Sequence, residues 1–147
     1  MIIRSAMVNK KEKYNQFYMD IADRVSQMSY AVRLQVGSVL VKNDNIISYG
    51  WNGTPRGWDN NCESVLDDGS LKTKPEVLHS EANCLSKIAK STISSEGATL
   101  FCTHAPCIDC AKMIYQAGIF TVYYRNEYRS TDGLEFLKRS GVDVIQT

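Results

Sequence analysis

The 147-residue chain has no long hydrophobic run and no excess of charge of one sign. No apolar stretch approaches the roughly 20 residues of a membrane span, and the start of the chain, residues 1–4, lacks the apolar core of a signal peptide. Its 17 basic and 16 acidic side chains give a formal net charge of +1, which disfavours a strong electrostatic grip on duplex nucleic acid. We therefore expect neither a membrane nor duplex nucleic acid as a partner.

A disulfide framework is not expected either, because the five cysteines are an odd number in a chain without a secretion signal. Reduced thiols and a cytoplasmic location follow from this. The sequence contains no repeats or low-complexity stretches, and its length suits one compact domain. We expect a single domain over residues 1–147, in which residues 1–9 form a mobile tail or a subunit contact.

Hydrophobic periodicity predicts an alternation of helices and strands. Apolar residues recur at spacings of three and four between residues 11 and 29, which indicates a helix. Further helices are expected over 78–89, 106–117 and 132–139, and strands over 36–41, 46–51, 98–103, 121–124 and 142–145. The turn-rich segment 52–75 is interpreted as a long loop. This order predicts an α/β fold, a three-layer α/β/α sandwich with a mixed sheet of about five strands.

The most informative feature is a His-Ser-Glu motif at residues 79–81, followed by Pro-Cys-Ile-Asp-Cys at residues 106–110. The imidazole of His79 and the thiolates of Cys107 and Cys110 can fill three corners of a tetrahedral zinc site and leave the fourth open for water. The two cysteines are three residues apart at the start of a predicted helix, so they project from one face where the helix dipole favours thiolates. Three protein ligands with an open position are typical of a catalytic zinc.

Glu81 is not needed as a ligand and lies beside His79, so we predict that it moves protons. Other interpretations remain open from the residues alone. Cys102 or His104 could close the zinc site as a fourth ligand, with His104 better placed because it lies three residues before Cys107. A Cys-x-x-Cys pair by itself also fits a redox dithiol.

The joint pattern resembles the zinc-dependent nucleobase deaminases, whose signature is H-x-E followed by P-C-x-x-C. The resemblance covers most of the chain and implies a cytidine deaminase-like fold with Zn²⁺ held by His79, Cys107 and Cys110. It implies that Glu81 carries protons from water to the base and then to departing ammonia. It also implies that Ser80 and Pro106, inside the two motifs, contribute to substrate binding.

Residues 50–57, Gly-Trp-Asn-Gly-Thr-Pro-Arg-Gly, are similar to the Gly-Tyr-Asn-Gly-x-Pro motif of deoxycytidylate (dCMP) deaminases, with Trp51 in place of the usual Tyr. This resemblance implies that Asn52 contacts the nucleoside sugar. It also implies an allosteric nucleotide site, for which the candidate residues are Gly50, Trp51, Asn52, Gly53, Arg56 and Lys90. A β-turn with Asn-Gly at positive φ is the structural alternative for this stretch.

Tyr128 ends a Tyr-x-x-x-Tyr pattern that resembles the base-stacking segment of the same family. The alternative is a surface aromatic that covers the next helix. The candidates for the phosphate contact are Arg56, Arg125, Arg129 and Lys90, with none preferred.

The resemblance implies conversion of dCMP to dUMP for thymidylate synthesis, with dCTP as activator and dTTP as inhibitor, together with Mg²⁺. It also implies a homohexamer, located in the host cytoplasm if the chain is phage-encoded. One zinc per subunit is expected, because Ala31 and Val32 stand where some phage relatives carry cysteines that bind a second zinc. Cys84 and Cys102 are expected to be buried thiols.

Three rival functions remain. A tRNA adenosine deaminase shares both motifs, but it places its motif Asn close before the zinc His, whereas 27 residues separate Asn52 from His79 here. A free cytidine deaminase typically has another cysteine motif. A non-enzymatic zinc module would have no need of Glu81.

Overall fold

The computed structural model describes residues 9–147, in which helices and strands alternate along the chain. In order, the elements are α2 (Lys10–Ser26), β1 (Gly37–Lys42), β2 (Asn45–Trp51), β3 (Glu63–Val65), β4 (Leu71–Thr73), α3 (Ser80–Ala89), β5 (Thr99–His104), α4 (Ile108–Gln116), β6 (Thr121–Asn126), α5 (Asp132–Arg139) and β7 (Asp143–Gln146). Residues 1–8 of the expected tail lie outside the described residues, and Asn9 is the N-cap of α2.

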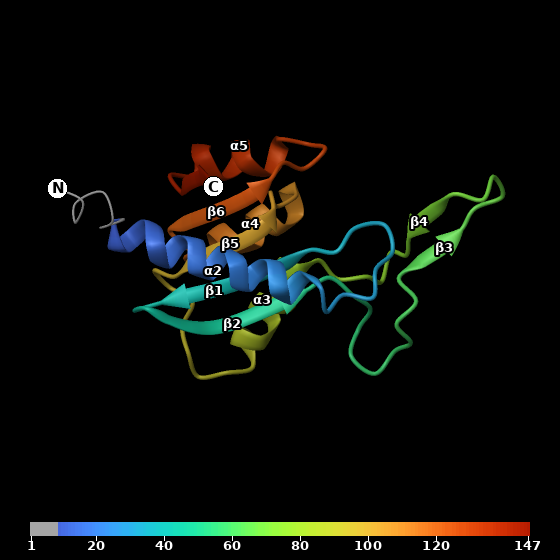
Figure 1. Ribbon diagram of the computed structural model, residues 1–147, viewed down its shortest axis with the longest axis horizontal. Coiled ribbons are helices and arrows are strands. Elements are labelled where there is room, and N and C mark those ends of the chain that lie inside the picture. The colour runs from blue at the N-terminus through green and yellow to red at the C-terminus, as the bar shows by residue number, and fades with distance from the viewer. Residues whose placement is uncertain (1–8) are drawn as a thin grey trace, which may run out of the picture.

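Five strands form a mixed sheet in the order β2-β1-β5-β6-β7. Strand β1 is antiparallel to both β2 and β5, whereas β5, β6 and β7 are parallel. Parallel neighbours need a crossover, which α4 and α5 provide. Helix α2 lies on one face of the sheet, and α3, α4 and α5 lie on the other (Figure 1). The predicted α/β/α sandwich with a mixed five-stranded sheet is confirmed.

The period of two along each strand divides the core between the two faces. Leu40, Leu100 and Val122 face α3 and α4, whereas Val39, Phe101 and Tyr123 pack under α2. Because β1, β5 and β6 are covered on both faces, their sequences are nearly continuous apolar runs. The expected buried positions of Cys84 and Cys102 are confirmed. Asn43 and Asp44 form the turn between β1 and β2, both with positive φ.

The interpretation of residues 52–75 as a loop without strands is wrong. Strands β3 and β4 lie inside it and pair antiparallel, with Glu63 opposite Thr73. Figure 1 shows that this hairpin, which we call the arm (residues 63–73), projects from the sheet. Strands of three residues are too short to give a period-two signal in the sequence.

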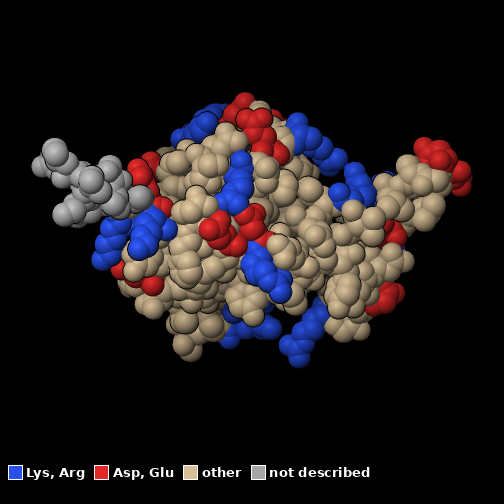
Figure 2. All heavy atoms as spheres, in the orientation of Figure 1, with Lys and Arg blue, Asp and Glu red and all other residues tan. Residues whose placement is uncertain are grey.

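The described surface carries mixed charge. On the face shown in Figure 2, Lys and Arg side chains are interspersed with Asp and Glu. Arg125, for example, pairs with Asp20 and Asp23 of α2. Across residues 9–147, we find no helical segment with the length and apolar character of a membrane span.

Candidate active site and metal centre

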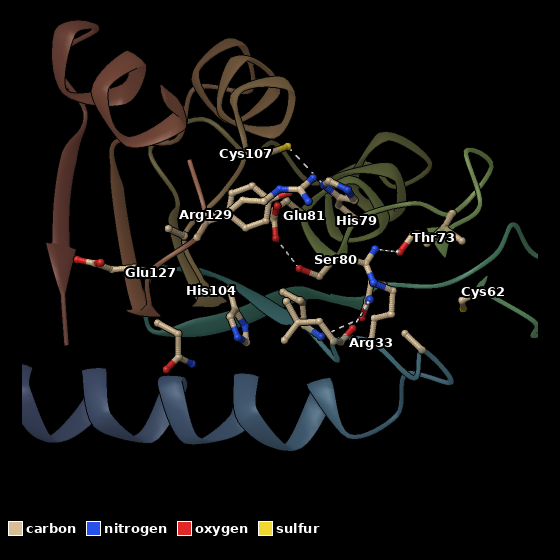
Figure 3. A pocket seen from close by; sticks show the side chains of 18 of the residues that line it. Arg33, Cys62, Thr73, His79, Ser80, Glu81, His104, Cys107, Glu127 and Arg129 are labelled. Atoms are coloured by element: carbon tan, nitrogen blue, oxygen red, sulfur yellow. Dashed lines mark hydrogen bonds between the residues drawn. The ribbon is translucent and has the colours of Figure 1, made fainter. Parts of the chain in front are cut away.

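The candidate metal site lies where the N-termini of α3 and α4 meet. His79 and Cys107 are the N-cap residues of these helices, and both have extended backbones (φ −72°, ψ 160° and φ −71°, ψ 169°). An N-cap side chain usually accepts a hydrogen bond from the first turn of its helix. Neither side chain does so here. The helix expected over residues 78–89 therefore begins at Ser80, which leaves His79 just before it with its imidazole directed toward Cys107 (Figure 3).

The three predicted ligands fit a zinc ion. His79 Nδ1 lies 3.4 Å from Cys107 Sγ and 3.4 Å from Cys110 Sγ. Tetrahedral zinc with ordinary bond lengths separates a nitrogen and a sulfur ligand by about 3.6 Å. All three ligand atoms lie within 4.8 Å of one another, and within residues 9–147 they make up the one such group of three or more His, Cys, Asp or Glu side chains. The expectation of one zinc per chain is consistent with this arrangement.

The electrostatics of the cysteine pair favour a metal-binding thiolate. A hydrogen bond from the Cys110 thiol, with a further one from His79, lowers the pKa of Cys107 to about 4, although partial burial opposes this. The same hydrogen bond with Cys107 raises the pKa of Cys110. Contact with Cys107 also raises the pKa of His79. Since the thiolate is the form that binds metal, the lowered pKa of Cys107 favours its role as a ligand.

Of the two candidates for a fourth protein ligand, Cys102 lies outside the pocket, whereas His104 lines it but is not part of the three-ligand group. Cys102 is fully buried in β5, where burial raises its pKa well above the usual value and its Sγ lies 3.7 Å from Ser38 Oγ. His104 Nδ1 lies 3.0 Å from Thr103 Oγ1. Neither residue belongs to the ligand group. The geometry therefore favours an open zinc site over a closed structural one.

Glu81 lies in the first turn of α3, is 3% exposed, and lines the pocket beside His79. Its Oε1 accepts a hydrogen bond of 2.5 Å from the Ser80 hydroxyl, and the Ser38 hydroxyl lies 3.3 Å from the same oxygen. Since both contacts use Oε1, Oε2 is the oxygen that remains for a ligand in the pocket.

The pocket has a volume of about 580 Å³, which is within the range of small-molecule sites. It brings together Asn52, Ser80 and Tyr128 with His79, Glu81 and Cys107. Figure 3 shows how Ser80, His79, Glu81 and Cys107 lie in it. Its walls come from the segment before β1, the base of the arm, the start of α3, and the loops after β5 and β6.

Pro106 is fully buried and lies behind the pocket wall rather than in it. The start of α5 packs directly against it, because a Cβ on Gly133 would lie 2.1 Å from the Pro106 carbonyl oxygen. Pro106 therefore fixes the backbone that leads into Cys107.

Asn52 holds the segment before β1 at the rim of the pocket. Its Oδ1 accepts a hydrogen bond of 2.9 Å from the Val36 backbone, and its Nδ2 donates one of 2.8 Å to the Leu34 carbonyl. An amide of this kind can make four hydrogen bonds. Asn52 therefore retains one donor hydrogen and one acceptor lone pair for a ligand.

Glu63 anchors the same segment before β1. This role of Glu63 is not evident from the sequence. This buried carboxylate of β3 accepts hydrogen bonds of 3.0 Å from the backbones of Val32 and Arg33. The guanidinium of Arg33 in turn donates to Thr73 of β4. No local pattern marks these residues, because the contacts join positions 30 to 40 residues apart.

Two arginines line the pocket. Arg33 stands on the side of Thr73, and Arg129 lies over the ring of half-buried Tyr128 at 5.4 Å (Figure 3). Of the sequence candidates for a phosphate contact, Arg129 lies here, whereas Arg56, Lys90 and Arg125 do not line this pocket.

The candidate effector residues lie outside this pocket, apart from Asn52. Gly50 is buried, and a Cβ there would lie 2.5 Å from both the Ser80 carbonyl oxygen and the Cys84 backbone nitrogen. Glycine at this position therefore lets α3 approach β2. The ammonium of Lys87 lies 5.3 Å from the centre of the Trp51 ring. Lys87 is therefore a basic neighbour of the residue 50–57 motif, and the sequence alone did not indicate this neighbour. Gly53 pairs with Leu78, and Arg56 and Lys90 are exposed.

Known proteins resemble the chain over most of its length. Residues 12–126 match the family described as the cytidine and deoxycytidylate deaminase zinc-binding region. ComE operon protein 2 of Bacillus subtilis (strain 168) is 34% identical over 138 residues, which cover 90% of this chain and 70% of that protein. Deoxycytidylate deaminase of Enterobacteria phage T4 is 31% identical, with 86% of each chain covered.

The structural match is closer still. The crystal structure of dCMP deaminase from the cyanophage S-TIM5, in complex with dCMP and dUMP, superimposes with a TM-score of 0.86 and 51% sequence identity. The match covers 95% of this chain and 99% of that one.

Proposed function

The chain belongs to the cytidine and deoxycytidylate deaminase family, and we propose that its reaction is the hydrolytic deamination of dCMP to dUMP and ammonia. The observation that carries this proposal is one pocket that combines a three-ligand zinc site, the buried carboxylate of Glu81 and the cationic side chains of Arg33 and Arg129. The 51% identical cyanophage protein binds dCMP and dUMP, which supports the choice of substrate.

His79, Cys107 and Cys110 would hold the zinc ion, which supplies a Lewis acid that lowers the pKa of water toward neutrality. Glu81 takes the proton of the water that attacks C4 of cytosine and delivers it to the adjacent ring nitrogen. The same carboxylate then takes the second proton from the hydroxyl now attached to C4 and gives it to the amino group, so that the C4–N bond breaks, a C4 carbonyl forms and ammonia leaves. One water is consumed and one ammonia is released for each dUMP formed.

The remaining pocket residues orient the nucleotide. The ring of Tyr128 provides a stacking surface for the pyrimidine, and the spare hydrogen-bonding capacity of Asn52 serves the sugar. Ser80 contributes indirectly by donating a hydrogen bond to Glu81. Pro106 is buried and contributes indirectly by fixing the backbone that leads into Cys107.

Arg33 and Arg129 would bind the 5′-phosphate. A guanidinium suits phosphate because it donates two parallel hydrogen bonds and stays charged. Arg33 is also held in place, since its backbone is anchored by Glu63 and its head group by Thr73. This pair would make the enzyme select the nucleotide over the nucleoside.

Replacing both arginines by alanine tests this selection. Each hydrogen bond to a charged group contributes about 1.5–3 kcal/mol, so loss of both guanidiniums should lower kcat/KM for dCMP by at least roughly 10- to 100-fold. The value for deoxycytidine should stay within about twofold, because that substrate has no phosphate. Ammonia release with dCMP, CMP, deoxycytidine, cytidine and adenosine-containing RNA measures both effects.

Arg139→Ala is the matched control, because this exposed arginine of α5 lies outside the pocket. An equal loss with dCMP and deoxycytidine would contradict the phosphate role. Faster turnover of RNA or cytidine than of dCMP by the wild-type protein would contradict the proposed reaction itself.

We further propose that the enzyme supplies dUMP for thymidylate synthesis and is regulated by dCTP and dTTP with Mg²⁺. The segment from Trp51 to Gly53, with Arg56 and Lys90 as further candidates, would contact the effector, while Gly50 serves the packing of α3. The ammonium of Lys87, which donates to the Tyr49 carbonyl and lies 5.3 Å from the Trp51 ring, adds positive charge near this segment and supports an anionic ligand there. The free state of all five cysteines supports a cytoplasmic location, in the host if the gene is of phage origin.

A homohexamer is proposed as the assembly. Large apolar side chains are exposed on the arm and the segments beside it, among them Tyr30 (67% exposed), Val32 (75%), Trp58 (60%) and Val65 (72%). Apolar surface of this kind favours contact with other subunits.

Kinetics with effectors and the mass in solution test regulation and assembly together. With Mg²⁺ present, dCTP should lower the dCMP concentration at half-maximal rate and dTTP should raise it, while light scattering should report six chains. A monomer whose rate does not respond to either nucleotide would refute both proposals and leave the catalytic one standing.

A further inference from the structure

A row of buried polar side chains connects Glu81 to the sheet. Ser38, Ser80 and Cys102 are completely buried, and Glu81 is 3% exposed. Ser38 Oγ lies 2.6 Å from Ser80 Oγ, and the Ser80 hydroxyl donates a 2.5 Å hydrogen bond to Glu81 Oε1. The proposed chemistry needs a carboxylate at position 81, but it does not by itself account for two buried hydroxyls behind it.

The donor count gives these hydrogen bonds a direction. Each serine has one hydroxyl hydrogen. The Ser80 hydrogen is used on Glu81 Oε1, so Ser38 can donate to Ser80 Oγ at 2.6 Å, to Oε1 at 3.3 Å or to Cys102 Sγ at 3.7 Å. The two shorter contacts direct the Ser38 hydrogen toward the carboxylate. Hydrogen bonds to an ionised acceptor are about twice as strong as neutral ones.

The fold brings the two serines together from distant parts of the chain. In the sheet, Ser38 of β1 pairs with Gly50 of β2 on one side and with Cys102 of β5 on the other. The start of α3 rests on Gly50, where a Cβ would lie 2.5 Å from the Ser80 carbonyl oxygen. This close approach is what places the Ser80 side chain over Ser38.

We infer that Ser38 and Ser80 are positioning residues that hold Glu81 Oε1 toward the sheet and so aim Oε2 at the reacting base. The inference rests on the proposed role of Glu81 in deamination. The Glu81 carboxylate must exchange protons with the water, the ring nitrogen and the leaving amino group, so it must be held in one orientation. A displacement of a catalytic group by about 1 Å can lower the rate by roughly 100-fold. Buried hydroxyls supply this constraint without entering the pocket chemistry.

The test uses zinc-loaded Ser38→Ala, Ser80→Ala and the double variant. Without its hydroxyl donors the carboxylate can rotate, so kcat of the double variant for dCMP should fall by roughly 10- to 100-fold. KM should stay within about twofold of wild type, because both serines are completely buried and their hydroxyls are directed to Glu81. Crystal structures should show Glu81 in more than one rotamer in the double variant and in a single rotamer in the wild type.

Ser48→Ala is the matched control, since Ser48 is also buried and donates a 2.7 Å hydrogen bond to the Cys84 carbonyl of α3. It should lose stability without a change in kcat. Wild-type kcat in the double variant, or a rise in KM without a fall in kcat, would overturn the positioning role. Should the double variant fail to fold, the single variants decide, with the same outcomes. A wild-type protein that does not deaminate dCMP would instead refute the underlying function.

Discussion

Replacement of Glu81 by glutamine is expected to reduce kcat for dCMP by roughly 10²- to 10⁴-fold, the contribution typical of a general acid–base group. Glutamine keeps the shape of the side chain, and its amide oxygen can still accept the hydrogen bond from Ser80. It cannot carry a proton from water to the ring nitrogen. Zinc content should remain at the wild-type level, because Glu81 is not one of the three ligands. The rate of dCMP loss by ultraviolet absorbance and metal analysis of the same sample give both values.

Glu135→Gln is a suitable control for this experiment, since it removes an exposed carboxylate of α5 outside the pocket. It should leave both rate and zinc content unchanged. Near-normal turnover by Glu81→Gln would show that another group carries the protons. Loss of zinc from Glu81→Gln would show instead that the carboxylate is a ligand.

Alanine at Cys107 or Cys110 should abolish zinc binding and reduce deamination to the uncatalysed rate. The three ligand atoms converge on one point, so each single loss leaves two protein ligands for the metal. Zinc bound only by the folded protein also stabilises it, so both variants should melt at a lower temperature than the wild type. Metal analysis, activity and thermal unfolding of the purified variants measure the three effects.

Cys84→Ala provides the comparison for a buried cysteine that is not a ligand. Burial raises the pKa of Cys84 to about 11, so it stays a thiol at neutral pH and does not bind metal. This variant should keep its zinc and its activity. Full zinc occupancy in either Cys107→Ala or Cys110→Ala would remove the basis of the proposed site.

The three candidate metal ligands can be picked out from the sequence because their signal is local. Cys107 and Cys110 are three residues apart, and His79 and Glu81 share one helix start, so each pair is placed by the geometry of a single helix turn. Strands β1, β5 and β6 could also be predicted, since they are covered on both faces and carry nearly continuous apolar runs, whereas the three-residue strands β3 and β4 could not.

Residues that act across the fold give no such signal. Ser38 meets Ser80 42 residues away, and Glu63 meets Val32 31 residues away. The glycine-containing motif shows the same limit, because the packing role of Gly50 depends on contacts with Ser80 and Cys84, which come 30 and 34 positions later. Contacts of this kind follow from the packing of elements, which the spacing of residues within one element does not encode.

The central claim is an open zinc site, and a crystal structure of the zinc-loaded protein tests it most directly. We predict a single zinc bound by His79 Nδ1, Cys107 Sγ and Cys110 Sγ, with solvent at the fourth position within hydrogen-bonding distance of Glu81. A fourth protein atom on the metal, from His104 or Cys102, would contradict the account.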